Sequence, residues 1–225
     1  MYTIAVLLAC VGATWAAGCC IPPQWEATTS FVISMIHNDK LVVAPGYSMM
    51  AYDGVNKVLG QYETVYLNSA TPRSYGVLLD YKTNTKYTLN SEGACYRSTL
   101  NRDVAELSGC IPNNATMVSQ NIVIGIGSNS MKVDTYKFNF EGSAAFVTVS
   151  SENCIPVKEV IRGSLEGNNF IQDLQYQNIT GGISHPENLV VPPKGCENAP
   201  MFSAHFASDG FMGNVIGRRS VFLGL

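Results

Sequence analysis

Short runs of alternating apolar and polar residues, separated by turn residues, recur along most of this 225-residue chain. In the run 24–36, Trp25, Phe31 and Ile33 occupy alternate positions, which places their side chains on one face of a strand. Short turns such as Asp53-Gly54 join most runs, and short turns connect antiparallel neighbours. The pattern predicts an all-β fold, a sandwich or a barrel. The predicted strands are 24–36, 47–53, 56–66, 74–81, 85–90, 120–127, 131–140, 144–151, 157–165 and 170–179.

Helical periodicity is confined to two short segments, 186–189 and 102–107, where brief helical turns are expected. Residues 1–18 contain an apolar run at 4–11 followed by small residues, which predicts a secretory signal peptide. This run is too short for a membrane-spanning helix. Residues 19–199 then form a single β domain. The apolar, glycine-broken segment 200–225 is expected to be a tail that docks on the domain, stays mobile or is trimmed at Arg218-Arg219.

The charge balance excludes one class of partner. The chain has 14 Lys and Arg residues against 17 Asp and Glu residues, and its formal net charge is −3. Binding to a phosphate backbone requires clustered basic residues that displace counterions, and the basic residues here are scattered. The sequence therefore predicts that the protein does not bind nucleic acid.

Cysteines and sequons support an extracellular destination. Removal of the leader takes Cys10 away and leaves an even number of cysteines, which in a secreted chain predicts three disulfides. Spacing alone does not choose among the possible pairings. No C-x-x-C motif is present to suggest a zinc ribbon or a thioredoxin-like site. The sequons at Asn114 and Asn178 predict glycosylated surface loops.

No catalytic constellation can be assembled from the sequence. His37, His185 and His205 lie in neither an H-E-x-x-H motif nor a triad pattern, so no catalytic residue is predicted and the chain is expected not to be an enzyme. The dispersed carboxylates are expected to be solvated: Asp80, Glu92, Asp134 and Glu141. For calcium, no EF-hand loop is present. Asp53 or Asp80 could supply oxygen ligands, although a turn explains Asp53 without a metal.

A curved antiparallel sheet can enclose an apolar cavity that holds a lipid-like ligand. The same side chains could instead fill a packed core, and the sequence leaves both readings open. The residues predicted to line such a pocket are Ile33, Val77, Leu79, Tyr136, Phe138, Phe140 and Val147.

Several motifs taken together resemble the ependymin family over residues 20–196. They include Pro23-Gln24-Trp25-Glu26, Tyr52-Asp53-Gly54, Cys154-Ile155-Pro156-Val157 and the segment from Gly182-Ile183 to Pro192-Pro193 and Cys196. The resemblance implies a secreted, glycosylated protein with two curved antiparallel sheets around a hydrophobic pocket, as in bacterial lipoprotein carriers. It also implies homodimers, bound Ca²⁺, cell–matrix contact and lipid handling outside the cell or in the lysosomal lumen.

The resemblance further implies a disulfide pattern. Cys20 and Cys154 match one joined pair of the family and Cys95 and Cys196 match a second, which leaves Cys19–Cys110 as the third bridge. The resulting hypothesis is a secreted carrier of a hydrophobic ligand. The alternative is a structural or signalling glycoprotein whose surface binds matrix or a receptor while its core is simply packed.

Overall fold

The computed structural model describes residues 18–66, 71–100, 109–140, 142–165 and 167–201. Nearly all of the predicted leader, the 102–107 segment and most of the predicted tail therefore lie outside the described residues. The strands are β1 (Gln24–His37), β2 (Lys40–Asp53), β3 (Val58–Val65), β4 (Arg73–Asp80), β5 (Thr85–Leu89), β6 (Cys95–Thr99), β7 (Thr116–Ile126), β8 (Asn129–Phe140), β9 (Ser143–Ser150), β10 (Pro156–Leu165) and β11 (Asn168–Gly181). The helical segments are α1 (Pro186–Leu189) and the 3-10 turn η1 (Cys196–Asn198).

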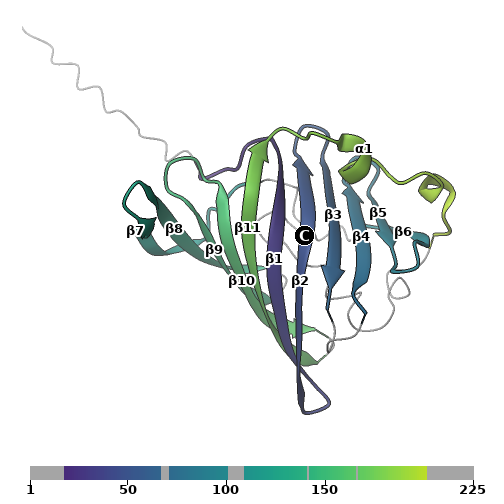
Figure 1. The fold of residues 1–225 in the computed structure, drawn as a ribbon, viewed down its shortest axis with the longest axis horizontal. Coiled ribbons are helices and arrows are strands. Elements are labelled where there is room, and N and C mark those ends of the chain that lie inside the picture. Colours follow the sequence, from purple (N-terminus) through teal and green to yellow (C-terminus); the bar gives the residue numbers. More distant parts are fainter. Residues whose placement is uncertain (1–17, 67–70, 101–108, 141, 166, 202–225) are drawn as a thin grey trace, which may run out of the picture.

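All eleven strands belong to one antiparallel sheet in the order β6-β5-β4-β3-β2-β1-β11-β10-β9-β8-β7 (Figure 1). Strands β1–β6 and β7–β11 form two meanders, and the pairing of β1 with β11 joins them at the centre of the sheet. The all-β antiparallel prediction is confirmed. The expected two sheets are instead one continuous, curved sheet, because β1 and β11 pair along most of their length.

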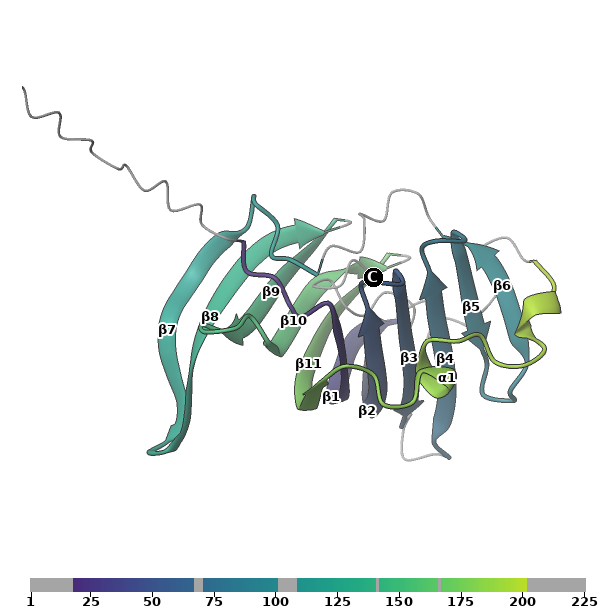
Figure 2. The ribbon, with the colours of Figure 1, turned by 90° about the horizontal axis from the view of Figure 1, so that it is seen from above.

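The sheet curves along its width, so it has a concave and a convex face (Figure 2). On β1 the side chains of Trp25, Phe31, Ile33 and Met35 are buried at alternate positions, as the period-2 pattern predicts. They join one core cluster with buried residues of both meanders, from Val77 on β4 to Val147 on β9. We call the face that carries this cluster the concave face.

Three elements differ from the sequence expectation by more than two residues at a boundary or were not predicted at all. β2 begins at Lys40 rather than at residue 47, because Asn38 and Asp39 adopt positive φ and form a tight turn between His37 and Lys40. β7 begins at Thr116 rather than at residue 120, and β6 was not predicted. Helix α1 occupies the predicted residues, and neither α1 nor η1 is long enough to cross a membrane in the part of the chain described.

Three disulfides are present, and two of them correct the expected pairing. Cys19 bonds Cys154 and Cys20 bonds Cys110, so the expected Cys20–Cys154 and Cys19–Cys110 bridges are wrong. The reason is backbone register. Cys20 lies directly opposite Cys110 in a β-bridge, and Ile21 donates its N–H to the Gly109 carbonyl beside it. The adjacent Cys19 is left to bond Cys154 in the β9–β10 loop.

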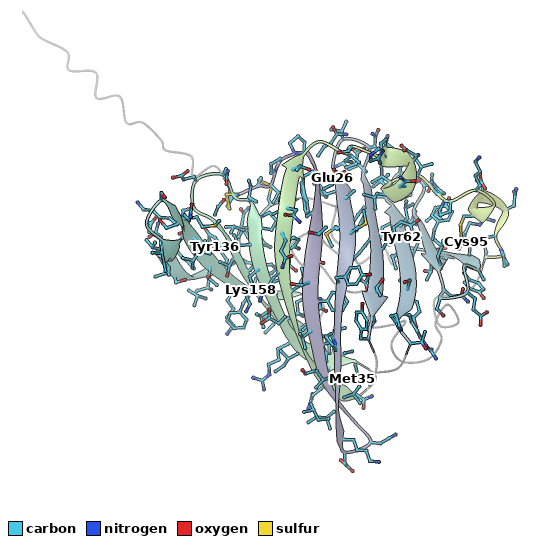
Figure 3. All side chains as sticks on the ribbon, viewed as in Figure 1. Glu26, Met35, Tyr62, Cys95, Tyr136 and Lys158 are labelled. Atoms are coloured by element: carbon cyan, nitrogen blue, oxygen red, sulfur yellow. A yellow bond between two sulfur atoms is a disulfide. The ribbon has the colours of Figure 1, made fainter. Side chains whose placement is uncertain are left out.

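The third bridge joins Cys95 to Cys196, as the resemblance implies. Cys95 begins β6 at the outer edge of the sheet (Figure 3), and Cys196 begins η1. The chain after α1 is thereby fixed to the edge of the first meander. A backbone hydrogen bond from Arg97 to the Pro200 carbonyl and a side-chain bond to the Ala199 carbonyl add to this attachment.

Candidate functional site

The concave face gathers most of the side chains predicted to line a pocket. Ile33, Val77, Leu79, Phe138 and Val147 are buried members of one core cluster. Tyr136 is partly buried and packs against that cluster, and burial together with the nearby Asp134 carboxylate raises its phenol pKa. The side chain of Phe140 lies outside the described residues. These side chains come from both meanders, so the curvature of the sheet brings them together.

A row of polar side chains crosses the same concave face, and sequence reasoning missed it. Tyr176, Thr29, Ser48, Glu63 and Tyr75 are successive cross-strand partners on β11, β1, β2, β3 and β4, and all are buried. We call these five residues the polar row. Their strand positions carry the signal that could have revealed them, because each shares the period-2 phase of apolar core residues on its own strand.

Side-chain geometry gives hydrogen bonds to three members of the polar row, Thr29, Ser48 and Tyr176. The Thr29 and Ser48 hydroxyls lie 2.5 Å apart, and the Gln61 amide donates to the Ser48 hydroxyl at 3.3 Å. At the β11 end, the Tyr176 hydroxyl donates to the buried carboxylate of Glu159 on β10, at 2.9 Å. Buried polar groups in an otherwise apolar face are costly unless they are paired, and these hydrogen bonds offset that cost for the groups that form them.

A pocket of about 580 Å³ adjoins the polar row at Tyr176. It lies between the β7–β8 hairpin, the β9–β10 loop and the end of β11, and we call it the end pocket. None of the side chains predicted to line a pocket contributes to it. Its lining residues are Val123, Ser130, Met131, Lys132, Ser150, Glu152, Asn153, Ile155, Pro156, Val157, Tyr176, Gln177, Asn178 and Ile179.

Two aromatic contacts connect the end pocket to the core. The indole of Trp25 stacks on Tyr52, with ring centroids 6.1 Å apart, and meets Tyr176 edge-on at 6.0 Å. Trp25 is almost completely buried. A ligand that moved Tyr176 in the pocket wall would therefore change the environment of Trp25.

The carboxylates considered for calcium, Asp53 and Asp80, accept hydrogen bonds from nearby turn residues. Asp53 accepts hydrogen bonds from the N–H and the side-chain amide of Asn56, both at 2.8 Å. Asp80 accepts from the N–H groups of Lys82 and Thr83. Among the residues that the structure describes, no group of three or more His, Cys, Asp or Glu side chains could hold a metal ion. Calcium binding stays a prediction of the resemblance.

The expectation that Asp134 is solvated is wrong. It is 8% exposed rather than solvated, and it accepts hydrogen bonds from the N–H of Asn121 and the hydroxyl of Ser151. Asp134 thus ties the bulged part of β7 to the turn after β9.

Both sequons fall on exposed residues. Asn114 lies in the turn before β7, and Asn178 lies near the end of β11, where its amide nitrogen donates to the Thr28 hydroxyl at 3.1 Å. Asn178 also lines the end pocket. Glycosylation of both residues remains a prediction, and a glycan on Asn178 would stand at the rim of the pocket.

The two histidine positions that the structure describes, His37 and His185, lie outside the polar row. His37 ends β1, although its side chain is outside the described part, and His205 falls wholly outside it. His185 precedes α1 and is exposed, with its ring nitrogen 3.4 Å from Glu187. The structure thus brings neither of the two described histidine positions into the polar row.

A family model decides the classification. The model described as Ependymin matches residues 69–196, more than half of the chain. The chain belongs to the ependymin family. Family membership and three disulfides are consistent with an extracellular ependymin-family protein. No curated protein matches the sequence.

Two solved structures are similar to this ependymin-family chain at low identity. A LolA superfamily protein from Nitrosomonas europaea aligns with a TM-score of 0.32 and 7% identity, over 73% of this chain and 88% of that chain. A DUF1329 family protein from Desulfovibrio piger aligns with a TM-score of 0.31 and 8% identity, over 73% and 89%. At these scores the fold assignment rests on the strand pairing of this chain alone.

Proposed function

We propose that this protein is a secreted glycoprotein that binds a hydrophobic, lipid-like ligand on the concave side of its sheet. The observation that carries the proposal is the end pocket of about 580 Å³, whose wall residue Tyr176 belongs to the buried concave face. Ligand pockets of this size, with mostly apolar walls and a few polar groups, are typical of small-molecule binding sites.

Burial of an alkyl chain supplies the affinity in this proposal. Each methylene removed from water contributes about 0.8 kcal/mol, so about ten buried methylenes contribute about 8 kcal/mol before the entropy cost of association. No chemical step is needed, and the ligand should be released unchanged. Secretion places the protein in the extracellular space or the lysosomal lumen, and glycans at Asn114 and Asn178 belong to the same proposal. Homodimers and cell–matrix contact stay predictions of the resemblance, as does Ca²⁺ binding, and no step here depends on them.

Native mass spectrometry of the purified, leader-free protein tests the proposal. We expect adducts with the masses of single-chain or double-chain lipids, and organic extraction should recover those lipids chemically intact. A delipidated sample should regain the adducts when it is incubated with a panel of fatty acids, monoacylglycerols, long-chain amines and phospholipids. A protein that remains free of adducts against the whole panel would overturn the proposal.

The convex face favours a second candidate function, binding to matrix or a receptor. Large apolar side chains are exposed on neighbouring strands of this face, on β11, β1 and β2, and Leu41 is 70% exposed. Contiguous exposed apolar surface often marks an interaction site. The residues are Val32, Leu41, Val43, Tyr47, Met49 and Ile171. Replacing Leu41 and Met49 with serine should abolish such binding and leave lipid adducts unchanged, whereas the carrier proposal predicts no dependence on these residues.

A further inference from the structure

We propose that the β7–β8 hairpin docks this protein on a phospholipid bilayer by inserting its apolar tip into the head-group region. We call residues 122–132 of this hairpin the tip segment. The inference goes beyond the proposed function, because the docking stands or fails whether or not a ligand occupies the end pocket. It concerns the surface at which the protein meets lipid.

The tip segment extends past the neighbouring strand. The last residue pair between β8 and β9 is Val133 with Ser150, and the Ser151 N–H then donates to the Lys132 carbonyl. Beyond this point the residues of β8 pair with β7 alone in the part of the chain that the structure describes. Figure 2 shows the two-stranded projection that results at the β7 end of the sheet.

Large apolar side chains are exposed on both faces of the tip segment. Ile126 is 90% exposed, the highest fraction among the large apolar side chains described. Ile122, Val123 and Ile124 are consecutive and all exposed, so alternation along the strand directs them to opposite faces. Met131, the cross-strand partner of Ile124, is exposed as well. A protein partner docked on one face would leave the other face in water, whereas a lipid phase surrounds both.

The tip segment carries almost no charge. Lys132 is its only charged side chain, and no Asp or Glu occurs from residue 116 to residue 133. A charged tip would have to lose hydration to enter a bilayer, and this tip does not incur that cost. Lys132 is exposed at the base of the segment, where its ammonium group can contact lipid phosphates while the residues beyond it enter.

The β1–β2 hairpin provides a comparison within the same chain. It too has exposed apolar side chains near its turn, with Ile36 54% and Leu41 70% exposed. Its turn, however, consists of Asn38 and Asp39 and is followed by Lys40, and all three are exposed. Charged groups therefore occupy the point that would enter a bilayer first. Both hairpins expose apolar surface, and only the β7–β8 hairpin has an uncharged tip.

The backbone limits the depth of insertion. β7 is an edge strand, so its outward N–H and C=O groups have no strand partner in the described structure. Such groups cannot remain unsatisfied in hydrocarbon, but water and polar head groups satisfy them at the interface. Insertion should therefore be about 5–10 Å deep, the depth of interfacial segments. A rise of about 3.3 Å per residue brings both Ile126 and Ile124 within that depth.

The hairpin also forms one wall of the end pocket. Val123, Met131 and Lys132 are among the lining residues, whereas Ile124 and Ile126 are not. Docking would therefore place the pocket beside the lipid surface, where an apolar ligand enters without crossing bulk water. The same division allows the tip to be changed without a change in the pocket lining.

Flotation with phosphatidylcholine vesicles tests the inference. The leader-free protein is mixed with small unilamellar vesicles of dioleoylphosphatidylcholine, and the fraction that floats with the vesicles is measured at low and at high salt. We expect the parent to float under both conditions, because one lysine supplies little electrostatic attraction. Ile126→Asn should lower the apparent affinity by roughly 10-fold or more, the effect of withdrawing one aliphatic side chain from an apolar phase.

The matched control is Leu41→Asn, which makes the same kind of change at the exposed tip of the β1–β2 hairpin. It should float like the parent. Equal losses in both variants would show general adsorption of apolar surface and would overturn the inference, as would a parent that does not float. A parent that is dimeric in analytical ultracentrifugation and becomes monomeric as Ile126→Asn would show that a second copy covers the tip, which also overturns it.

A tryptophan at the tip provides a second readout that does not depend on lost binding. Ile126→Trp should show a blue-shifted emission with vesicles and quenching by phosphatidylcholine brominated near the head group, after subtraction of the parent spectrum that Trp25 supplies. Leu41→Trp should show neither effect. An Ile126→Trp protein that floats without either change would place the docking surface elsewhere and overturn the inference.

Native mass spectrometry separates this inference from the proposed function. Ile126→Asn should still form the lipid adduct of the parent when the lipid is delivered from ethanol rather than from vesicles, because Ile126 does not line the end pocket. Loss of the adduct under this delivery would assign the tip to the ligand site and overturn the docking inference. A parent that floats but forms no adduct with any lipid of the panel would support the docking inference and overturn the proposed function.

Discussion

Asp53 ends β2 with its carboxylate turned back onto the loop that follows. Burial by itself would raise the pKa of this carboxyl, but the hydrogen bonds from the Asn56 side chain and backbone outweigh burial and hold the pKa below its ordinary value of 3.8. Lowering of the pKa in the folded state means that the ionised form stabilises the fold. This contribution is complete above the ordinary pKa and is lost as the pH falls below it through the folded-state pKa.

Replacing Asp53 with alanine should therefore lower the free energy of unfolding at pH 7 by about 1–3 kcal/mol, because the amide donors of Asn56 lose a charged acceptor. The variant should also lose less stability than the parent between roughly pH 4 and pH 2, the window that begins near the ordinary pKa of 3.8 and runs below it. Urea unfolding with intact disulfides at each pH measures both effects. A parent and a variant with parallel acid profiles would contradict the assignment.

The disulfide partners of the adjacent cysteines can be tested with one substitution. In Cys20→Ser the observed pairing leaves Cys110 as the only cysteine without its partner among the three bridges described. Alkylation without reduction, followed by digestion and mass spectrometry, should then label the peptide that contains Cys110. A label on Cys154 would instead support the pairing that the family resemblance implies.

The disulfide pairing and the burial of individual charged residues could not be predicted from the sequence. The number of bridges follows from counting cysteines, but the choice between Cys19 and Cys20 depends on a one-residue register that spacing does not encode. Burial of Glu63 and Glu159 was equally hidden, because a glutamate is normally exposed. Only their position in the apolar phase of β3 and β10 marks them, and that phase becomes informative once the strand bounds are known.

Helix α1 lies against the ends of strands in the first meander (Figure 1), and its position depends on a glycine. A Cβ atom added to Gly60 on β3 would lie 1.6 Å from the backbone carbonyl oxygen of Leu189, the last residue of α1. Backbone atoms cannot yield to such a contact as a flexible side chain can. The absence of a side chain at Gly60 is thus what lets α1 approach the sheet.

The substitution Gly60→Ala should displace α1 and destabilise the protein by about 1–3 kcal/mol, the usual cost of overpacking. Gly181→Ala is the matched control, because a Cβ atom there would meet no atom within 4 Å. Thermal unfolding of both variants measures the difference. Equal melting temperatures for the two variants would show that α1 can shift at no cost.

Elements with clear alternation and turn residues were the ones that the sequence predicted well. The turn at Asp53-Gly54 and the helix at 186–189 lie where expected. The first half of β2 was missed because it contains Pro45 and Gly46, which usually argue against a central strand. The Pro45 carbonyl accepts a hydrogen bond from Tyr66, and the ring of Phe31 fills the space over Gly46, so tertiary packing overrides the local signal.

On the scale of the whole molecule, Trp25 should report on ligand binding. After removal of residues 1–18 it is the only tryptophan, and its indole contacts Tyr176 in the wall of the end pocket. Titration with a bound lipid should change the intensity or wavelength of Trp25 emission until the protein is saturated. Tyr176→Phe should retain this response, since the ring contact remains. An emission spectrum that does not respond while adducts form would place the ligand elsewhere.

The union of the two meanders could not be predicted from the sequence. Antiparallel order within each meander follows from short turns. β1 and β11, however, are the first and last strands of the domain in the sequence, and no local pattern sets their register. A sandwich of two sheets satisfies the same alternation. The formation of a single sheet therefore depends on the long-range pairing of β1 with β11, which forms only in the folded protein.

The central place of β1 has a consequence for biosynthesis. Of the strands in the described residues, this one leaves the ribosome first, and its neighbour β11 leaves last. The first meander can form early, but β1 must then wait with an open edge of unsatisfied amides and carbonyls until translation is nearly complete. A nascent chain stopped before β11 exposes the middle of the future sheet, and we expect edge-to-edge aggregation to be most favoured at this stage.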